Sequence, residues 1–291
     1  MAPDRSIGRS FSGWARSGGT AQMSQYGGMW RTQQEPVPHV DEGVFSQGRA
    51  GVRFEWGMEG APAVLSQHAA LVVVDILSFS TATTIAVAKG TAVYPHAWPS
   101  SEVEQFARRH GAAFAVRRRQ VDGDHPWSLS PTHLMVAPHV DRLVLPSPNG
   151  SAIAAAAAAE VVLVGSLRNA SAVGRWLRQN SFGTVERPVV VIAAGERWAS
   201  GALRPALEDL LGAGAVIASF DPDHALSPEA EAARAAWMAA ASCLPDTLKA
   251  CSSGAELTAA GYESDVLLAA EGDVESVVPL SVDGAFRPAE A

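Results

Sequence analysis

The chain has 291 residues, a formal net charge of −8, 47% hydrophobic and 18% charged residues, which is typical of a globular protein with one large or two modest domains. This acidic balance excludes a broad basic surface for nucleic acid, and no apolar run approaches the roughly 20 residues of a membrane helix. Because the two cysteines lack metal-binding spacing and the N-terminus lacks an apolar signal core, we expect a soluble, cytoplasmic protein with reduced thiols.

The first segment, residues 1–42, is rich in Gly, Ser, Gln, Pro and Arg and shows no hydrophobic period. Such a composition predicts a disordered N-terminal tail; an arm that docks on a partner subunit is the alternative, and a homo-oligomer is compatible with the sequence. The remaining residues, 43–291, are predicted to form one α/β region, with 43–145 and 146–291 as two candidate subdomains.

The most informative pattern lies in the middle of the chain. An apolar run at Leu143–Leu145 leads into a polar loop at 146–151, an alanine-rich stretch, a second apolar run at Val161–Val164 and a second polar loop at 165–169. A strand–helix–strand unit of this length predicts a parallel pair with a right-handed crossover. Both polar loops would then open at the same edge of the sheet, where α/β proteins place their ligand sites.

Similar units flank this one. Residues 52–56 alternate as in a half-exposed strand, whereas 70–77 form a continuous apolar run that suits a strand buried on both faces. Further strands are expected at 91–95, 113–116, 188–195 and 276–280. A helix is expected from the hydroxyl-rich segment 78–84 to about Lys89. Further helices are expected at 102–109, 170–179, 203–211 and 227–241, and two or three more after residue 245. The last residues are expected to fray.

The predicted fold class is therefore α/β, with a mostly parallel or mixed sheet flanked by helices. Residues 117–139 are expected to form a long irregular loop that covers the site.

Two segments at the predicted sheet edge carry the first site candidates. Asp75 ends a buried strand, where a carboxylate is costly unless it is paired or binds a ligand; the alternative is an acceptor for the hydroxyl loop beside it. Asn149, Gly150 and Ser151 stand where a helix begins, so Ser151 can cap the helix and Gly150 can let backbone amides approach an anion. The alternative there is a plain N-cap turn.

Arginines and acids follow the next two strands. Arg168 and Asn169 precede a helix, and an arginine beside a helix N-terminus suits a bound anion better than it suits the helix dipole. Arg204 and Glu208 are four residues apart, with Asp209 next to them. They form either an exposed ion pair or a phosphate-binding arginine beside a metal-binding acid.

These loops share a chemistry of oxygen acids, amides, hydroxyls and arginines. The acids are Asp75, Glu196, Glu208, Asp209 and Asp265, with Asp265 equally explained as a helix-start acid. Carboxylates suit Mg²⁺, and arginines suit a doubly anionic substrate, so the mixture fits metal-assisted hydrolysis of a phosphate ester. No P-loop and no G-x-S-x-G elbow is present in the sequence.

Six segments together give the chain a resemblance to a known family. They are VVVDIL (72–77), SPNGSAIA (147–154), GSLRNASAV (165–173), AAGERW (193–198), GALRPALEDLLGAGA (201–215) and GYESDVLLAAEGD (261–273). In this order they resemble the 2-phosphosulpholactate phosphatases of coenzyme M biosynthesis, which are Mg²⁺-dependent acid phosphatases with an α/β fold of their own. The segments span most of residues 70–280.

The resemblance implies roles for the candidate residues. Asp75, Glu208 and Asp209 are the expected catalytic acids, and Asp75, Glu196 and Asp209 the expected Mg²⁺ ligands. The expected substrate-binding residues are Asn149, Gly150, Ser151, Arg168, Asn169 and Arg204. We expect a small phosphoester as the substrate and no nucleic acid or membrane as partner. We also expect direct attack by metal-activated water, because no nucleophilic side chain is evident.

The sequence departs from the family pattern at two places. Ser78 stands where the family usually has an arginine directly after its D-V-L, and 121–138 differs from the family's Gly/Glu-containing segment. Loss of a cation would weaken binding of a substrate that carries both sulfonate and phosphate. The natural substrate is therefore either 2-phosphosulpholactate or a related phosphoester. A non-catalytic binder of a phosphorylated metabolite is the alternative function, since a binder needs the arginines but not the acids.

Overall fold

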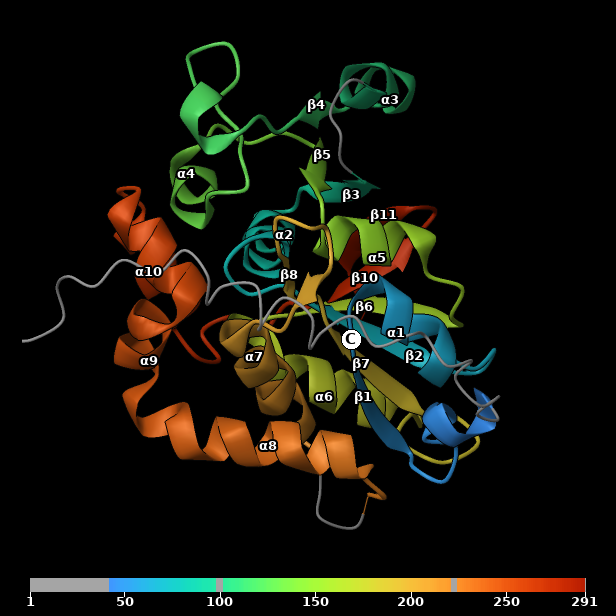
Figure 1. Ribbon diagram of the computed structural model, residues 1–291. Helices are drawn as coiled ribbons and strands as arrows, with labels where there is room; N and C mark the ends of the chain where they lie inside the picture. Colours follow the sequence, from blue (N-terminus) through green and yellow to red (C-terminus); the bar gives the residue numbers. More distant parts are fainter. Residues whose placement is uncertain (1–41, 98–101, 221–223, 291) are drawn as a thin grey trace, which may run out of the picture. The chain divides into compact units, whose positions relative to one another are not determined.

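A mixed sheet of nine strands forms the centre of the described structure, in the order β1-β7-β2-β6-β10-β11-β3-β5-β4 (Figure 1). The computed structural model describes residues 42–97, 102–220 and 224–290, so the predicted N-terminal tail lies outside the described residues. The strands are β1 (Val52–Trp56), β2 (Ala70–Val74), β3 (Ala92–Ala97), β4 (Ala113–Phe114), β5 (Arg142–Ser147), β6 (Val161–Gly165), β7 (Val189–Ala193), β10 (Pro279–Val282) and β11 (Ala285–Pro288). The expected mixed α/β architecture is confirmed.

Helices and short 3₁₀ turns connect these strands. The helices are α1 (Gly57–Val64), α2 (Phe79–Ala88), α3 (Val103–His110), α4 (Pro131–Val136), α5 (Gly150–Ala156), α6 (Ala170–Gln179), α7 (Leu207–Ala218), α8 (Pro228–Ala240), α9 (Leu244–Ala250), α10 (Ser252–Ala259) and α11 (Glu263–Ala269), with 3₁₀ turns η1 (Glu42–Ser46), η3 (Arg118–Gln120), η4 (Leu167–Asn169) and η5 (Ala241–Cys243). None of the helices in the described ranges is both long and apolar enough to cross a membrane.

The sheet consists of two parallel groups joined by a hairpin. Strands β1, β7, β2 and β6 are parallel, as are β3, β5 and β4. Between them, the pairings β6–β10, β10–β11 and β11–β3 are all antiparallel, so the two groups run in opposite directions. The predicted parallel pairing of β5 with β6 is therefore wrong, because apolar runs identify strands but not their neighbours.

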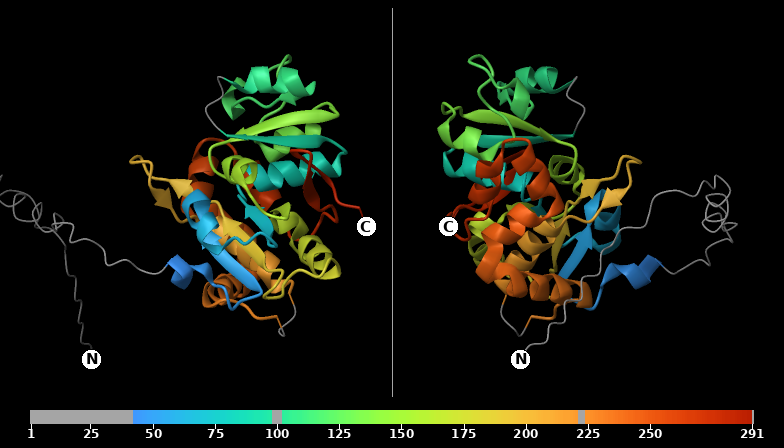
Figure 2. Two further views of the ribbon diagram at one scale, coloured as in Figure 1. Left: turned by 90° about the vertical axis from the view of Figure 1, so that its right-hand side faces the viewer. Right: turned by 60° about the vertical axis from the view of Figure 1, so that its left-hand side comes forward.

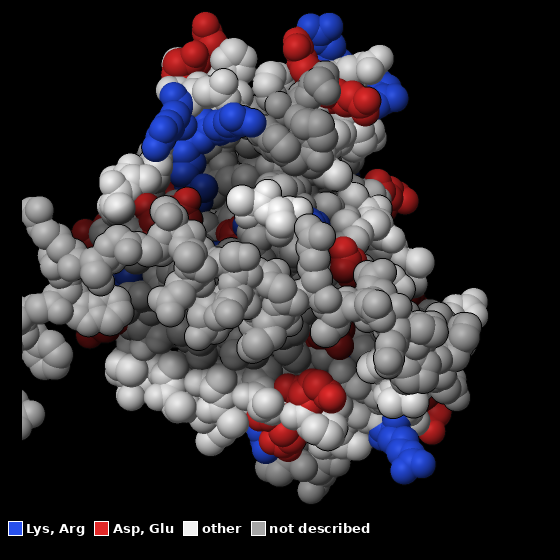
Figure 3. Space-filling view, in the orientation of Figure 1, with Lys and Arg blue, Asp and Glu red and all other residues white. Residues whose placement is uncertain are grey.

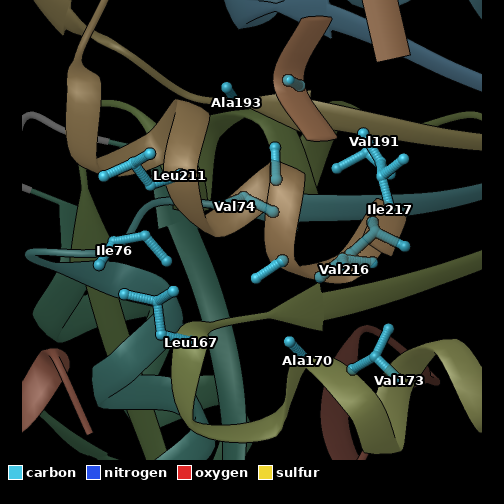
Figure 4. Close-up of a cluster of buried hydrophobic side chains, with 14 of the residues drawn as sticks. Val74, Ile76, Leu167, Ala170, Val173, Val191, Ala193, Leu211, Val216 and Ile217 are labelled. Carbon is cyan, nitrogen blue, oxygen red and sulfur yellow. The ribbon is translucent and has the colours of Figure 1, made fainter. Parts of the chain in front are cut away.

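Alternate residues of the central strands supply two hydrophobic layers. In β2, Val72 and Val74 pack with residues of α6, α7 and α8, whereas Leu71 and Val73 pack with residues of α1, α2 and α5. Figure 4 shows the first layer, in which Val74 lies beside Leu211 of α7. The side chains of successive strand residues point to opposite faces, so the continuous apolar run becomes a strand buried on both sides, as predicted.

Several predicted helices begin and end near the expected residues. Gly111 terminates α3 with a φ of +56°, a conformation that glycine adopts without strain. Ser227 starts α8, where its hydroxyl accepts a hydrogen bond from the amide of Ala230 and Pro228 occupies the first turn. These ends depend on local chemistry, so the sequence was sufficient to place them.

The helix expected at 203–211 is displaced in the structure. Leu203–Arg204 forms strand β9, which pairs with β8 (Glu196–Arg197) in a hairpin that projects from the end of β7 (Figure 2). Helix α7 starts later than expected and continues through Gly212, where the predicted helix ended, and through Gly214. Their role is close packing: a Cβ on Gly214 would lie 2.2 Å from the carbonyl oxygen of Ala233 in α8.

Three other expectations are corrected. Strand β1 is not half-exposed, because Arg53 is buried and donates to the carbonyl oxygens of Ala50 and Val64. The residues expected to fray at the C-terminus form β11, which completes the sheet. The supposed irregular loop at 117–139 includes η3 and α4.

Replacement of Gly214 by alanine tests the close packing of α7 on α8. Alanine favours a helix by about 1 kcal/mol, so an open position would gain stability. At Gly214 we expect a loss of about 1–3 kcal/mol in the free energy of unfolding, because the neighbouring backbone cannot move aside. Urea unfolding measures the change.

The matched control is Gly272→Ala, where a Cβ would have no neighbour within 4 Å. It should change the free energy of unfolding by no more than about 0.5 kcal/mol. Equal stability of the two variants would contradict the packing role of Gly214.

Candidate functional site

The ends of β2 and β7 and the start of α7 bring four acids together. Val74 pairs with Ala193, so the residues that follow these two parallel strands leave the sheet at the same edge. The Asp209 carboxylate joins the two exits: Oδ1 accepts from the amide of Ile76 at 2.7 Å and Oδ2 from the amide of Gly195 at 2.9 Å. Asp75, Glu196 and Glu208 lie around this clamp, close enough for their charges to interact.

The loop after β5 closes on Asp75. Asp75 Oδ2 accepts a hydrogen bond from the amide of Gly150 at 2.9 Å and from the hydroxyl of Ser147 at 3.3 Å. A Cβ on Gly150 would lie 2.6 Å from Asp75 Oδ2 and 2.8 Å from the Phe79 ring, so only glycine permits this approach. The polar loop at 146–151 thus reaches the acids although its strand belongs to the other half of the sheet.

A second set of contacts surrounds Glu196. Asn149 Nδ2 donates to Glu196 Oε2 at 3.1 Å, and the β8–β9 hairpin places Arg204 opposite Glu196. Arg204 is held by the hydroxyl of Ser253 at 2.9 Å and lies over the Trp198 ring, with 5.8 Å from Cζ to the ring centroid. A fixed cation therefore stands beside the acids.

Some predicted site residues have other partners. Arg168 pairs with Glu271 and Glu275 and donates to the carbonyl of Leu268. Asn169 caps its own turn, accepting from the amide of Ser166 and donating to Val277 O. Both fix the C-terminal segment and are not brought into the acidic cluster.

Two more candidates serve local structure. Ser151 donates its buried hydroxyl to the carbonyl of Leu145 and does not cap α5. Asp265 accepts hydrogen bonds from Ser130 and Thr132 and pairs with Arg118 at 3.2 Å. Asp265 therefore anchors the start of α4.

Two contacts of the cluster were not predicted. Ser147 lies within a motif that the sequence singled out, but nothing marked its hydroxyl as a partner of Asp75. The thiol of Cys251 donates to Glu208 Oε2 at 3.3 Å, and burial raises the pKa of this thiol to about 12. No sequence signal links two residues that are 43 positions apart.

The chain matches a known protein family over most of its length. The family model of 2-phosphosulpholactate phosphatase matches residues 59–284, well over half of the chain. The chain belongs to the 2-phosphosulpholactate phosphatase family. No curated protein matches the chain. Membership supports phosphatase activity, and the matched residues include all four acids of the cluster.

Burial governs the protonation of Asp75 in this family member. The pKa of Asp75 is raised to about 6, with removal from water as the largest cause and the nearby charge of Glu208 acting in the same direction. Hydrogen bonds from the Gly150 amide and the Ser147 hydroxyl act in the opposite direction, because they stabilise the carboxylate. The hydrogen bonds that hold the Asp75 carboxylate in place thus also limit the rise of its pKa.

Glu196 and Asp209 are shifted in the same direction. Burial, followed by repulsion from Asp75 and Glu208, raises the pKa of Glu196 to about 7, although Arg204 opposes the shift. Burial and the same two acids raise the pKa of Asp209 well above its usual value. Mutual repulsion of this kind is relieved by protons or by a cation.

The donor chemistry of the cluster fits a hard divalent cation, since such ions prefer carboxylate oxygens. The arrangement is less favourable: within the part of the chain that the structure describes, no group of three or more His, Cys, Asp or Glu side chains is placed to hold a metal ion. Asp209 also uses both oxygens to bind backbone amides. A cation at this position would therefore require side chains of the cluster to turn.

The raised pKa of Glu196 predicts a pH-dependent effect of Glu196→Gln. A carboxyl whose pKa is higher in the folded state stabilises the protein when protonated, and this contribution is lost as pH rises from about 4.5 to about 7. A glutamine side chain does not ionise, so the variant does not lose this stability as pH rises. Relative to the wild type, we expect it to gain on the order of 2 kcal/mol between pH 5 and pH 8. Urea unfolding of the metal-free proteins at both values measures the gain.

Glu229→Gln, an exposed position in the first turn of α8, is the control and should show no such gain. If the two variants respond equally to pH, Glu196 does not have a raised pKa.

Proposed function

We propose that this chain is a Mg²⁺-dependent phosphatase that hydrolyses 2-phosphosulpholactate, or a related anionic phosphoester, to the hydroxy acid and phosphate. The observation that carries the proposal is the cluster of four carboxylates, three of them buried and Glu196 partly buried, with Arg204 beside it. Family membership supports the phosphatase chemistry. The substrate and the metal are our inference.

Three acids of the cluster are the proposed metal ligands. Asp75, Glu196 and Asp209 would hold Mg²⁺, which would supply positive charge to the phosphoryl oxygens and offset the repulsion among the acids. Their raised pKa values support this role, because acids that repel one another in a buried site gain most from a cation.

The remaining residues would bind and orient the substrate. Arg204, fixed by Ser253 and Trp198, provides a preformed cation for the phosphate. Asn149 can turn its amide from Glu196 to a substrate oxygen. Glu208 Oε2 accepts the Cys251 thiol, which orients the carboxylate and leaves Oε1 to accept a proton from the attacking water.

Loss of the Asp75 charge should slow turnover strongly. We expect Asp75→Asn to lower phosphate release from 2-phosphosulpholactate by a factor of about 10²–10³, and a chelator to stop release by the wild type. Asp246→Asn, at an exposed position of α9, is the control and should keep full activity. A wild type that binds the phosphoester without releasing phosphate, together with undiminished binding by Asp75→Asn, would favour the non-catalytic binder.

Metal binding can be tested without activity. We expect Mg²⁺ to raise the melting temperature of the wild type, because ligand at about 100 times its dissociation constant stabilises by about 2.7 kcal/mol. Affinity should rise with pH, since the acids must lose protons first. Glu196→Gln should reduce the shift, and Asp246→Asn should retain it. A full shift in Glu196→Gln would place the ion away from this cluster.

A further inference from the structure

A cavity of about 550 Å³ lies on the other side of the loop that closes over Asp75. Its wall includes the apolar side chains of Leu129, Pro146, Pro148 and Leu257 and the ring of Tyr262. Cavities of this size and lining suit organic ligands with a substantial apolar part. The acidic cluster presents carboxylates and Arg204, so the two sites differ in the chemistry that they accept.

Two structural elements connect the cavity with the acids. Pro146 and Pro148 flank Ser147, whose hydroxyl lies 3.3 Å from Asp75 Oδ2. Helix α10 carries Ser253, which holds Arg204, and one turn later Leu257, which lines the cavity. At 1.5 Å per residue, these two positions are about 6 Å apart along the helix. The cavity and the acidic cluster therefore share the loop after β5 and helix α10.

One wall of the cavity is basic. Arg118 is fixed by Asp265, by the carbonyl oxygen of Leu77 at 3.1 Å and by the Tyr262 ring, 5.6 Å from Cζ to the centroid. Arg119 is exposed, also lines the cavity and makes no ion pair with another described residue. Figure 3 shows basic side chains gathered on this face, just above the position of α4 in Figure 1. Glu256 contributes the acidic side chain of the lining.

We propose that this cavity binds the organic part of the substrate, and that the preferred substrate is a phosphoester of a hydroxy acid with an aromatic side group. The inference rests on the proposed phosphatase function. The phosphate would lie at Arg204, the ring would pack against Leu257 and Tyr262, and the acid group would face Arg119. Tyr262 and the prolines offer the flat apolar contacts that a ring prefers, and arginine offers the matching charge.

The test compares two substrates that differ only in a phenyl ring, phospholactate and the 2-phosphoester of 3-phenyllactate. We expect kcat/KM for the phenyl compound to exceed that for phospholactate by at least about tenfold, because a filled apolar pocket discriminates by this factor or more. Ala260→Trp should fill the cavity from an exposed position and lower this ratio toward one. Arg119→Gln should raise KM for the phenyl compound with little change in kcat.

Arg109→Gln, at an exposed position of α3 outside the cavity, is the matched control and should keep the wild-type ratio. Equal kcat/KM for the two substrates, or a ratio that Ala260→Trp leaves unchanged, would overturn the cavity assignment while leaving the phosphatase proposal intact.

If neither of these compounds nor 2-phosphosulpholactate releases phosphate, the proposed function fails, and calorimetric titration of the two compounds still decides the role of the cavity. Binding of the phenyl compound at least about tenfold tighter than phospholactate, and weakened by Ala260→Trp, would support it. Equal affinities would reject it.

Discussion

The carboxylate of Asp209 is the contact on which the site depends. It accepts hydrogen bonds from the amides of Ile76 and Gly195, which follow two neighbouring parallel strands. Its place in the first turn of α7 is favoured by the helix dipole. One buried group thus fixes the exits of β2 and β7 relative to α7, and these three elements carry Asp75, Glu196 and Glu208.

The site also joins the two oppositely directed halves of the sheet. Asp75 belongs to the β2 half, and its partner Gly150 follows β5 in the other half. The hairpin of β10 and β11 connects the halves, and α2 packs against strands of both. Because the acids and the closing loop come from different halves, the integrity of the whole sheet controls the geometry of the cluster.

The acidic cluster and the neighbouring cavity differ in charge and in shape. Burial and mutual repulsion in the acidic cluster raise the pKa of Asp75 and Glu196. The neighbouring cavity is apolar with a basic wall at Arg118 and Arg119. The substrate that we propose, a phosphoester with an apolar group and a second anion, would complement both the cluster and the cavity.

The sequence by itself determined most elements, the family and several of the acids. Apolar runs such as 70–77 and local caps such as Ser227 identify strands and helix ends, because these depend on neighbours in the chain. Only the tertiary structure decided that β5 and β6 do not pair, that Arg168 binds Glu275, and that Cys251 contacts Glu208. These outcomes depend on contacts between residues far apart in sequence, which strand period and helix propensity do not encode.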